Sequence, residues 1–267
     1  MSLIEDSLDI VERTFRSFCD ELMASYGNID FTLKKDHSQV TYLDRKIETT
    51  LRKKLSGFSE LGFEGEETGV FGSRDTYWLI DPIDGTVPFI RGLPYCTNMA
   101  ALIDNNQVIA SIIYDFVHDA MYVARKDHGA YKNGHPISVS SRSLDNSYLA
   151  IESPKFAEIR NLLGNDRIKC VTPFSTAGHG FIMTAEGKIE GRLQYQGFGK
   201  KYDYAPGALL VKEAGGKIIP LGEKEYGAES LNFAAVAPTV GVRVVSIYDQ
   251  LVSLHEKNNH EPLQGHV

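Results

Sequence analysis

Apolar and polar positions near the start of the chain alternate with the period of amphipathic helices. Between residues 4 and 22 apolar side chains recur every three or four positions, which predicts a helix that ends near Gly27. From 43 to 55 they recur every four positions, which predicts a second helix. Thr41 is its expected N-cap, and Asp44 three residues later completes a capping pattern.

Shorter apolar runs follow, separated by Asn, Asp and Gly residues that are typical of turns between strands. The expected strands are 61–63, 77–81, 95–103, 107–117, 120–125 and 129–134. Turn residues at 105–106, 119 and 128–129 would join the last four strands as a meander. The pattern therefore predicts an antiparallel sheet.

Beyond Ser140 strand patterns alternate with helix patterns. The expected strands are 147–153, 168–171, 190–195, 216–220 and 232–238, and the expected helices are 154–163, 175–185, 203–214 and 240–255. This alternation is typical of a layered α/β unit, so we predict an α+β fold with an N-terminal part, 1–140, and a C-terminal part, 141–267.

Composition narrows the possible partners. The 267 residues carry a formal charge of −7, which gives no general attraction to nucleic acid. No apolar run approaches the roughly 20 residues that span a bilayer, and the acidic start lacks the pattern of an export signal. Three cysteines, widely spaced and in no CxxC pair, are typical of reduced thiols in a cytoplasmic protein. We expect a globular protein with neither membrane nor nucleic-acid partners.

The stretch "YWLIDPIDGT" ends an apolar strand with two negative charges. Asp81 would project past the sheet edge, and a turn would bring Asp84 and the Ile83 carbonyl to the same side. Such hard oxygen donors are the ligands that Mg²⁺ prefers. Gly85 and Thr86 would begin a short helix whose free N–H groups can hold a phosphate. By itself, however, DPIDG is more often a simple turn.

Two other segments add carboxylates. "FEGEETG" places Glu66 and Glu67 just past a short strand; a solvated acidic loop is the favoured interpretation for Glu67 but not for Glu66. "KKYDYAPGALLVKEAGG" places Asp203 at a helix N-terminus, where a lone aspartate is by default a cap.

Taken together, these stretches resemble the inositol monophosphatase family of metal-dependent phosphatases, whose superfamily includes fructose-1,6-bisphosphatase and the 3′-phosphoadenosine phosphatases. The segments "KKDHSQVTYLD" and "MYVARKDHGAYKNGHPISVS" are also similar to family motifs, and the likeness extends in order from about residue 30 to 220. The resemblance implies a layered αβαβα sandwich of the sugar-phosphatase type.

The resemblance also implies a set of metal ligands. Glu66, Asp81 and the Ile83 carbonyl would hold one Mg²⁺. Asp81, Asp84 and Asp203 would hold a second, and a third, looser ion is expected at Glu66. Two such metals, roughly 3.5–4 Å apart, stabilise both the attacking and the leaving oxygen of a phosphoryl transfer.

Catalytic roles follow from the same resemblance. Thr86 and Asp44 would orient the attacking water and accept its proton, with Glu66 beside them on the metal. Lys34 would contribute positive charge near the phosphate, and a plain exposed lysine is the alternative. Glu67 would support the metal ligands from behind.

Expected substrate contacts come from several segments. They are Lys34, Asp84, Gly85, Thr86, Ser175, Thr176, Ala177, Gln194 and Asp203. Enzymes that act on inositol place an acidic residue shortly before the aspartate at Asp203, whereas this chain has Gln194, Tyr195 and Gln196 in that region. The identity of the alcohol is therefore open.

These features predict a phosphomonoesterase with two or three Mg²⁺ ions that hydrolyses a small phosphorylated alcohol, inositol monophosphate or a related polyol phosphate. A histidinol-phosphate phosphatase and a 3′-phosphoadenosine 5′-phosphate phosphatase are alternatives within the family. A non-catalytic or moonlighting dimeric module that binds protein or RNA is the alternative from another class. The resemblance further implies a homodimer and inhibition by lithium.

Overall fold

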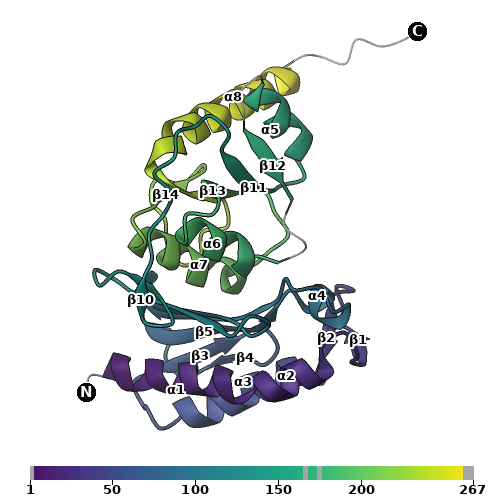
Figure 1. Ribbon diagram of the computed structural model, residues 1–267, viewed down its shortest axis with the longest axis vertical. Helices are drawn as coiled ribbons and strands as arrows, with labels where there is room; N and C mark the ends of the chain where they lie inside the picture. Colours follow the sequence, from purple (N-terminus) through teal and green to yellow (C-terminus); the bar gives the residue numbers. More distant parts are fainter. Residues whose placement is uncertain (1–2, 165–167, 173–175, 261–267) are drawn as a thin grey trace.

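Five layers of secondary structure build the protein. The computed structural model describes residues 3–164, 168–172 and 176–260. Three pairs of helices alternate with two sheets, one pair under the large sheet, one between the sheets and one over the small sheet (Figure 1). From bottom to top these pairs are α1 (Leu3–Ser17) with α3 (Tyr42–Leu55), α6 (Gly178–Ala185) with α7 (Lys201–Glu213), and α5 (Phe156–Leu163) with α8 (Gly241–His260). The predicted αβαβα sandwich is confirmed.

The large sheet has eight strands in the order β10-β9-β8-β7-β6-β5-β3-β4. Their bounds are β3 Gly62–Gly65, β4 Gly69–Phe71, β5 Thr76–Asp84, β6 Thr97–Asp104, β7 Gln107–Asp115, β8 Ala120–Arg125, β9 Ala130–Lys132 and β10 His135–Pro136. The prediction of a wholly antiparallel sheet is wrong at one pair, because β3 and β5 run parallel. The hairpin strand β4 returns the chain to the start of β3, so β5 sets out in the same direction.

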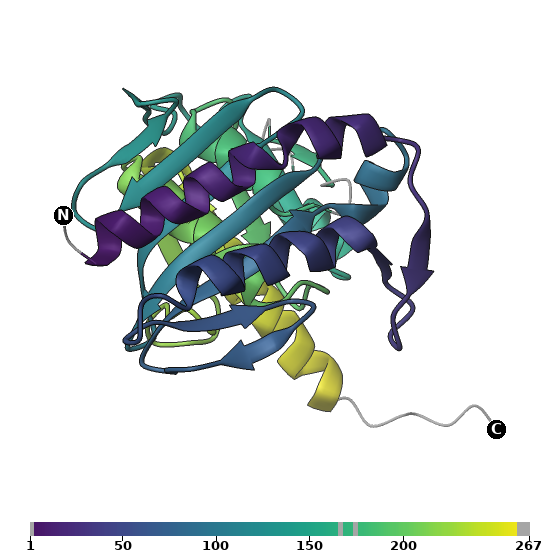
Figure 2. The same cartoon turned by 90° about the horizontal axis from the view of Figure 1, so that it is seen from below.

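Both faces of this sheet are buried. Tyr77 and Leu79 of β5 face the core shared with α6 and α7, while Trp78 and Ile80 face the core shared with α1 and α3. Successive side chains of a strand point to opposite faces, so a strand between two helical layers is apolar at every position. Figure 2 shows α1 and α3 side by side across the outer face. The burial explains the unbroken run "YWLI".

The small sheet has five strands in the order β12-β11-β13-β15-β14. Their bounds are β11 Tyr148–Glu152, β12 Lys169–Val171, β13 Gly191–Gln194, β14 Lys217–Pro220 and β15 Phe233–Val236. Strand β11 pairs in parallel with β12 and β13, and β15 pairs antiparallel with β13 and β14. One apolar core between the sheets joins side chains from both parts of the chain, and the division near residue 140 stays a prediction.

The predicted capping of α3 is confirmed. The Thr41 side chain accepts from the Leu43 amide at 3.2 Å, and Asp44 Oδ2 accepts from the Thr41 amide at 2.8 Å. Such a reciprocal box satisfies donors that a helix start otherwise leaves free. It also fixes the position of Asp44, which is buried.

The first predicted helix is interrupted at Phe18, so that α1 is followed by a separate α2 (Cys19–Ser25). The Ser17 hydroxyl donates to the Thr14 carbonyl at 2.7 Å, and the Phe18 amide bonds to the Phe15 carbonyl at 3.1 Å. Side-chain bonds of this kind compete with the helical pattern and end it locally.

Other element bounds differ by a few residues from those predicted. Helices expected from 154, 203 and 240 begin at Phe156, Lys201 and Gly241, and the start expected at 175 lies outside the described residues. Six short elements remain: β1 Phe31–Leu33, β2 Gln39–Thr41, α4 Thr86–Ile90 and the 3₁₀ turn Pro238–Val240, in addition to β4 and β10. Only the short helix at Thr86 was predicted.

The close packing of α6 on α7 gives a test of the fold. A Cβ added at Gly207 of α7 would lie 2.0 Å from the Phe181 ring of α6, so Gly207→Ala should force the helices apart. Overpacking of this kind costs about 1–3 kcal/mol, more than the ~1 kcal/mol that alanine gains within a helix. We expect a lower urea midpoint than for wild type. Gly57→Ala is the control, since its added Cβ has no neighbour nearer than 3.8 Å; equal midpoints for the two variants would contradict the prediction.

Candidate active site

Strand β5 supplies two carboxylates from one end. The strand does not end at Asp81, as predicted, but continues to Asp84, and its register with β6 shifts between these two residues. The Asn98 side chain donates to the Pro82 carbonyl at 2.5 Å and holds the irregular segment in the sheet. The bulge explains how two aspartates three positions apart reach the same place, since bulges re-aim side chains.

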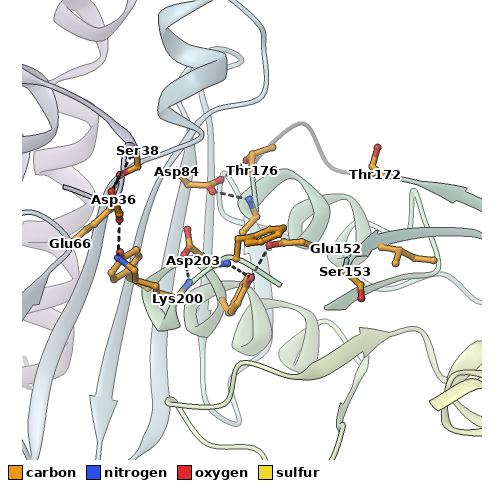
Figure 3. Close-up of a pocket in the computed structure, with 16 residues that line it drawn as sticks. Asp36, Ser38, Glu66, Asp84, Glu152, Ser153, Thr172, Thr176, Lys200 and Asp203 are labelled. Carbon is orange, nitrogen blue, oxygen red and sulfur yellow. Dashed lines mark hydrogen bonds and ion pairs between the residues drawn. The ribbon is translucent and has the colours of Figure 1, made fainter. Parts of the chain in front are cut away.

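Helix α7 adds the third carboxylate. Asp203 is the third residue of α7, and its Oδ2 accepts from the Lys200 amide at 2.5 Å, so it also caps the helix. Carboxylate oxygens of Asp81, Asp84 and Asp203 lie within 4.8 Å of one another. Asp84 and Asp203 are seen together beside Thr176 in Figure 3. The structure thus brings together three of the predicted metal ligands from segments about 120 residues apart in the sequence.

The start of α6 binds Asp84 with several donors. The amides of Ala177 and Gly178 donate to its two oxygens at 2.8 Å each, and the Thr176 hydroxyl donates at 2.5 Å. A Cβ at Gly178 would lie 2.3 Å from the Thr97 hydroxyl, so only glycine permits this approach. Thr176 and Ala177, expected at the substrate, contact Asp84 and also line the cavity beside it, and their contact with substrate stays a prediction. Ser175 lies outside the described residues.

Glu66 lies beside a lysine. Lys34 Nζ is 2.6 Å from Glu66 Oε1 and also forms an ion pair with Glu67. Burial opposes the charge of Lys34, but the two glutamates outweigh it and raise the Lys34 pKa. The interpretation of Glu67 as solvated is wrong, because its side chain is 5% exposed. The Glu67 amide donates to Glu48 of α3 at 2.8 Å, which draws this loop inward.

The residues expected to orient water lie on two elements. The Thr86 hydroxyl donates to the Ile83 carbonyl at 3.0 Å, and Asp44 accepts from the Thr41 hydroxyl at 2.6 Å. No hydrogen bond joins Thr86 to Asp44 within the described part of the chain. Gly85 has φ +80°, and a Cβ there would meet the Tyr95 carbonyl at 2.4 Å, so the turn requires glycine.

Burial and mutual repulsion raise the pKa values of carboxylates in the site. Asp81 is fully buried, and this burial, with Glu66, Asp203 and Asp84 nearby, holds its pKa well above the usual range. Burial and then Asp84 raise the pKa of Asp203 to about 8, and burial raises that of Asp44 to about 7. Crowded carboxylates keep their charge when cations share the site.

The donor set fits a hard divalent cation. Asp81 Oδ1 is buried and has no hydrogen-bond partner among the described residues, which leaves a lone pair free for a metal. All the clustered donors are oxygens, as Mg²⁺ and similar ions require.

A cavity of about 480 Å³ opens over the cluster (Figure 3). Beyond the carboxylates its polar wall includes Asp36, Ser38, Glu152, Ser153 and Thr172. A volume in this range suits a small molecule.

The far wall differs from the sequence-based expectation. Gln194 is fully buried and accepts from Arg192 Nε at 3.2 Å, so it lies behind the wall instead of in it. Glu152 lines the cavity in its place, ion-paired with the buried Arg192 and accepting from the Tyr204 hydroxyl at 2.8 Å. Glu152 ends the apolar run "YLAIE", the same strand-end signal that drew attention to Asp81, and it was missed.

The profile of the inositol monophosphatase family matches residues 6–255. The chain belongs to this family. Its members are metal-dependent phosphatases, that is, phosphoric monoester hydrolases, that act on phosphorylated small molecules. The chain is 27% identical over 256 residues to a Thermotoga maritima fructose-1,6-bisphosphatase/inositol-1-monophosphatase, covering 92% of this chain and 97% of that one. It is 32% identical over 218 residues to inositol monophosphatase 1 of Solanum lycopersicum, covering 74% and 78%.

Solved structures of family members agree with the fold. A Thermotoga maritima IMPase superposes with a TM-score of 0.80 at 26% identity, covering 93% of this chain and 98% of that chain. The extragenic suppressor protein suhB of Bartonella henselae has the same TM-score at 24% identity, covering 91% and 98%. The architecture is therefore that of the inositol monophosphatase family.

The raised pKa values predict how pH acts on the metal-free protein. The pKa of Asp203 is about 8 in the folded state against 3.8 normally, so the unfolded chain releases this proton first as pH rises. The free energy of unfolding should therefore decrease as the pH rises from about 4 to about 8. We expect Asp203→Asn, in EDTA, to melt several degrees above wild type at pH 8 and close to it at pH 4.

Asp145→Asn is the matched control, because Asp145 is exposed and far from α7 in the sequence. Added Mg²⁺ should raise the melting temperature of wild type more than that of Asp203→Asn. A difference between wild type and Asp203→Asn that does not change with pH would contradict the prediction.

Proposed function

We propose that this protein is a Mg²⁺-dependent phosphomonoesterase that hydrolyses a small phosphorylated alcohol, inositol monophosphate or a related polyol phosphate. The observation that carries the proposal is the cluster of Asp81, Asp84 and Asp203 at one end of a cavity of about 480 Å³. Like-charged, buried carboxylates with raised pKa values are typical of functional metal sites.

Oxygen ligands are assigned to each of the expected ions. Glu66, Asp81 and the Ile83 carbonyl would hold one Mg²⁺, Asp81, Asp84 and Asp203 a second, and Glu66 a third, looser ion. When bound, the ions would supply Lewis-acid stabilisation of the phosphate and lower the pKa of a bound water. The free Oδ1 of Asp81 and its position in the cluster support its role as the bridging ligand.

Proton transfer is assigned to Asp44 with Thr86. The pKa of Asp44, about 7 in the metal-free chain, is close to the value at which a general base works best near neutral pH. Two hydrogen bonds from Thr41 hold the carboxylate in one orientation. The Thr86 hydroxyl donates to the Ile83 carbonyl and leaves its oxygen lone pairs available to a water.

The phosphate and the alcohol of the substrate would contact different groups of the protein. The Gly85 and Thr86 amides would bind the phosphate, and Lys34 would offset negative charge beside it. At the far wall, the Glu152 carboxylate and the Ser153 hydroxyl offer acceptors for sugar-like hydroxyls, whereas Asp36 lies on the opposite side of the cavity, near Glu66 (Figure 3). This polar wall favours a polyol.

Several further features belong to the same proposal. We expect a homodimer and inhibition by lithium, both on the family resemblance alone. A cytoplasmic location is supported by the three cysteines, all of them free. No helix in the described part of the chain is both long and apolar enough to cross a membrane.

Asp81→Asn tests the metal-centred mechanism. Loss of one ligand charge should remove several kcal/mol of transition-state stabilisation, so kcat/KM with Mg²⁺ should fall by about 100-fold or more. Asp75→Asn, an exposed residue just before the opposite end of β5, should leave phosphate release unchanged. Equal activity of the two variants would rule out the mechanism.

A substrate panel tests the polyol assignment. We expect the highest kcat/KM for inositol 1-phosphate or glycerol phosphates, and lower activity in lithium. The comparison esters are histidinol phosphate, phosphoadenosine phosphate and fructose 1,6-bisphosphate, the last because of the Thermotoga maritima relative. Preference for a comparison ester would overturn the polyol assignment. No activity on any ester would overturn the proposal that the protein is a phosphomonoesterase.

A further inference from the structure

A second group of metal-binding side chains lies apart from the aspartate cluster. Asp115 is the last residue of β7, His118 is in the turn before β8, and His179 is the second residue of α6. One oxygen or nitrogen from each lies within 4.8 Å of those from the other two. None of the three has a part in the proposed phosphatase reaction.

The distances in this group resemble those of a tetrahedral metal site. His118 Nδ1 is 2.8 Å from Asp115 Oδ2, and His179 Nε2 is 3.3 Å from the same oxygen. A zinc ion with ligands at about 2.0–2.1 Å places neighbouring ligand atoms about 3.3 Å apart. Small side-chain rotations would therefore complete the geometry.

His179 lacks the hydrogen bonds that a buried imidazole normally makes. The residue is 7% exposed, and neither ring nitrogen has a partner with hydrogen-bond geometry among the described residues. The Tyr95 ring packs edge-on against it at 5.6 Å between centroids and restrains its orientation. Nδ1 has no partner among the described residues, and Nε2 meets Asp115 only at 3.3 Å without hydrogen-bond geometry, which is costly for a buried imidazole. A metal would bind the nitrogen that faces Asp115.

The other two ligands suit the same role. Asp115 is 4% exposed. Burial raises its pKa, but the imidazoles of His179 and His118 lower the pKa by more than burial raises it, which favours the charged carboxylate. The His118 side chain is 58% exposed, which leaves the group open to solvent on one side. An ion could enter there and keep a water as its fourth ligand.

We propose that Asp115, His118 and His179 bind one divalent transition-metal ion of the zinc type. Two imidazoles and one carboxylate favour Zn²⁺ or Co²⁺ over Mg²⁺, which prefers oxygen ligands alone. The ion would link the β7–β8 turn to the first turn of α6. Since the amide of Gly178, next to His179, donates to Asp84, the ion would brace the helix start that holds that carboxylate.

The test is a titration of the full chain with Co²⁺ and with Zn²⁺ in excess Mg²⁺, which occupies the oxygen-only site. Visible absorption of Co²⁺ reports tetrahedral binding, and calorimetry gives the Zn²⁺ affinity. We expect one tightly bound ion, with an affinity about 10-fold or more weaker in His118→Ala and in His179→Gln. Asp81→Asn and His128→Ala, which changes an exposed histidine elsewhere, should bind as wild type does.

A readout of stability accompanies the titration. At one Zn²⁺ concentration, the ion should raise the melting temperature of wild type and of His128→Ala more than that of His118→Ala, whose side chain is 58% exposed and packs little against the fold. Binding unchanged in both ligand variants, binding lost in Asp81→Asn, or no binding to wild type would overturn the proposal. The last result would identify the group as a carboxylate between two imidazoles with no metal function.

Discussion

Repulsion among buried carboxylates is the constraint on which the candidate active site depends. Asp81 is completely enclosed, and Asp84 and Asp203 lie close enough to raise its pKa. Burying these carboxylates removes them from water, and contacts with apolar side chains do not compensate for the lost solvation. The chain offsets part of the cost with Lys34 beside Glu66 and with the amides of α6 on Asp84. Bound cations would offset the remainder, so the cluster has the charge and the oxygen donors that could hold a metal ion.

The layered architecture explains how such a cluster is possible. The end of β5, the first turn of α6 and the first turn of α7 all meet between the two sheets. A helix start carries free amides and the positive end of the helix dipole, so the first turn of α6 stabilises the charge of the buried Asp84. Gly178 lets that helix approach Asp84 closely, and Gly207 lets α7 pack against α6.

Local signals predicted much of this site, and distant contacts account for the errors. The run "DPIDGT" and the capping pair Thr41 and Asp44 have short-range causes, and the structure has the capping box and the short helix that they predicted. Glu67 was misjudged because its burial depends on Glu48 of another helix and on Lys34. Gln194 was misplaced because the direction in which a strand residue faces depends on strand pairing, which no short window contains.

The sequence by itself determined the family, through the motifs that resemble it, and the three aspartates of the cluster, which stand in those motifs. It also determined the alternation of helices and strands, because periodicity and turn chemistry act over a few residues. The tertiary structure decided which carboxylates meet, which wall faces the cavity and that Asp115, His118 and His179 converge. These outcomes depend on sheet order and on the close packing of α6 and α7 between the sheets. Contacts between residues about 60 to 120 positions apart arise from that packing and have no signature in the local pattern.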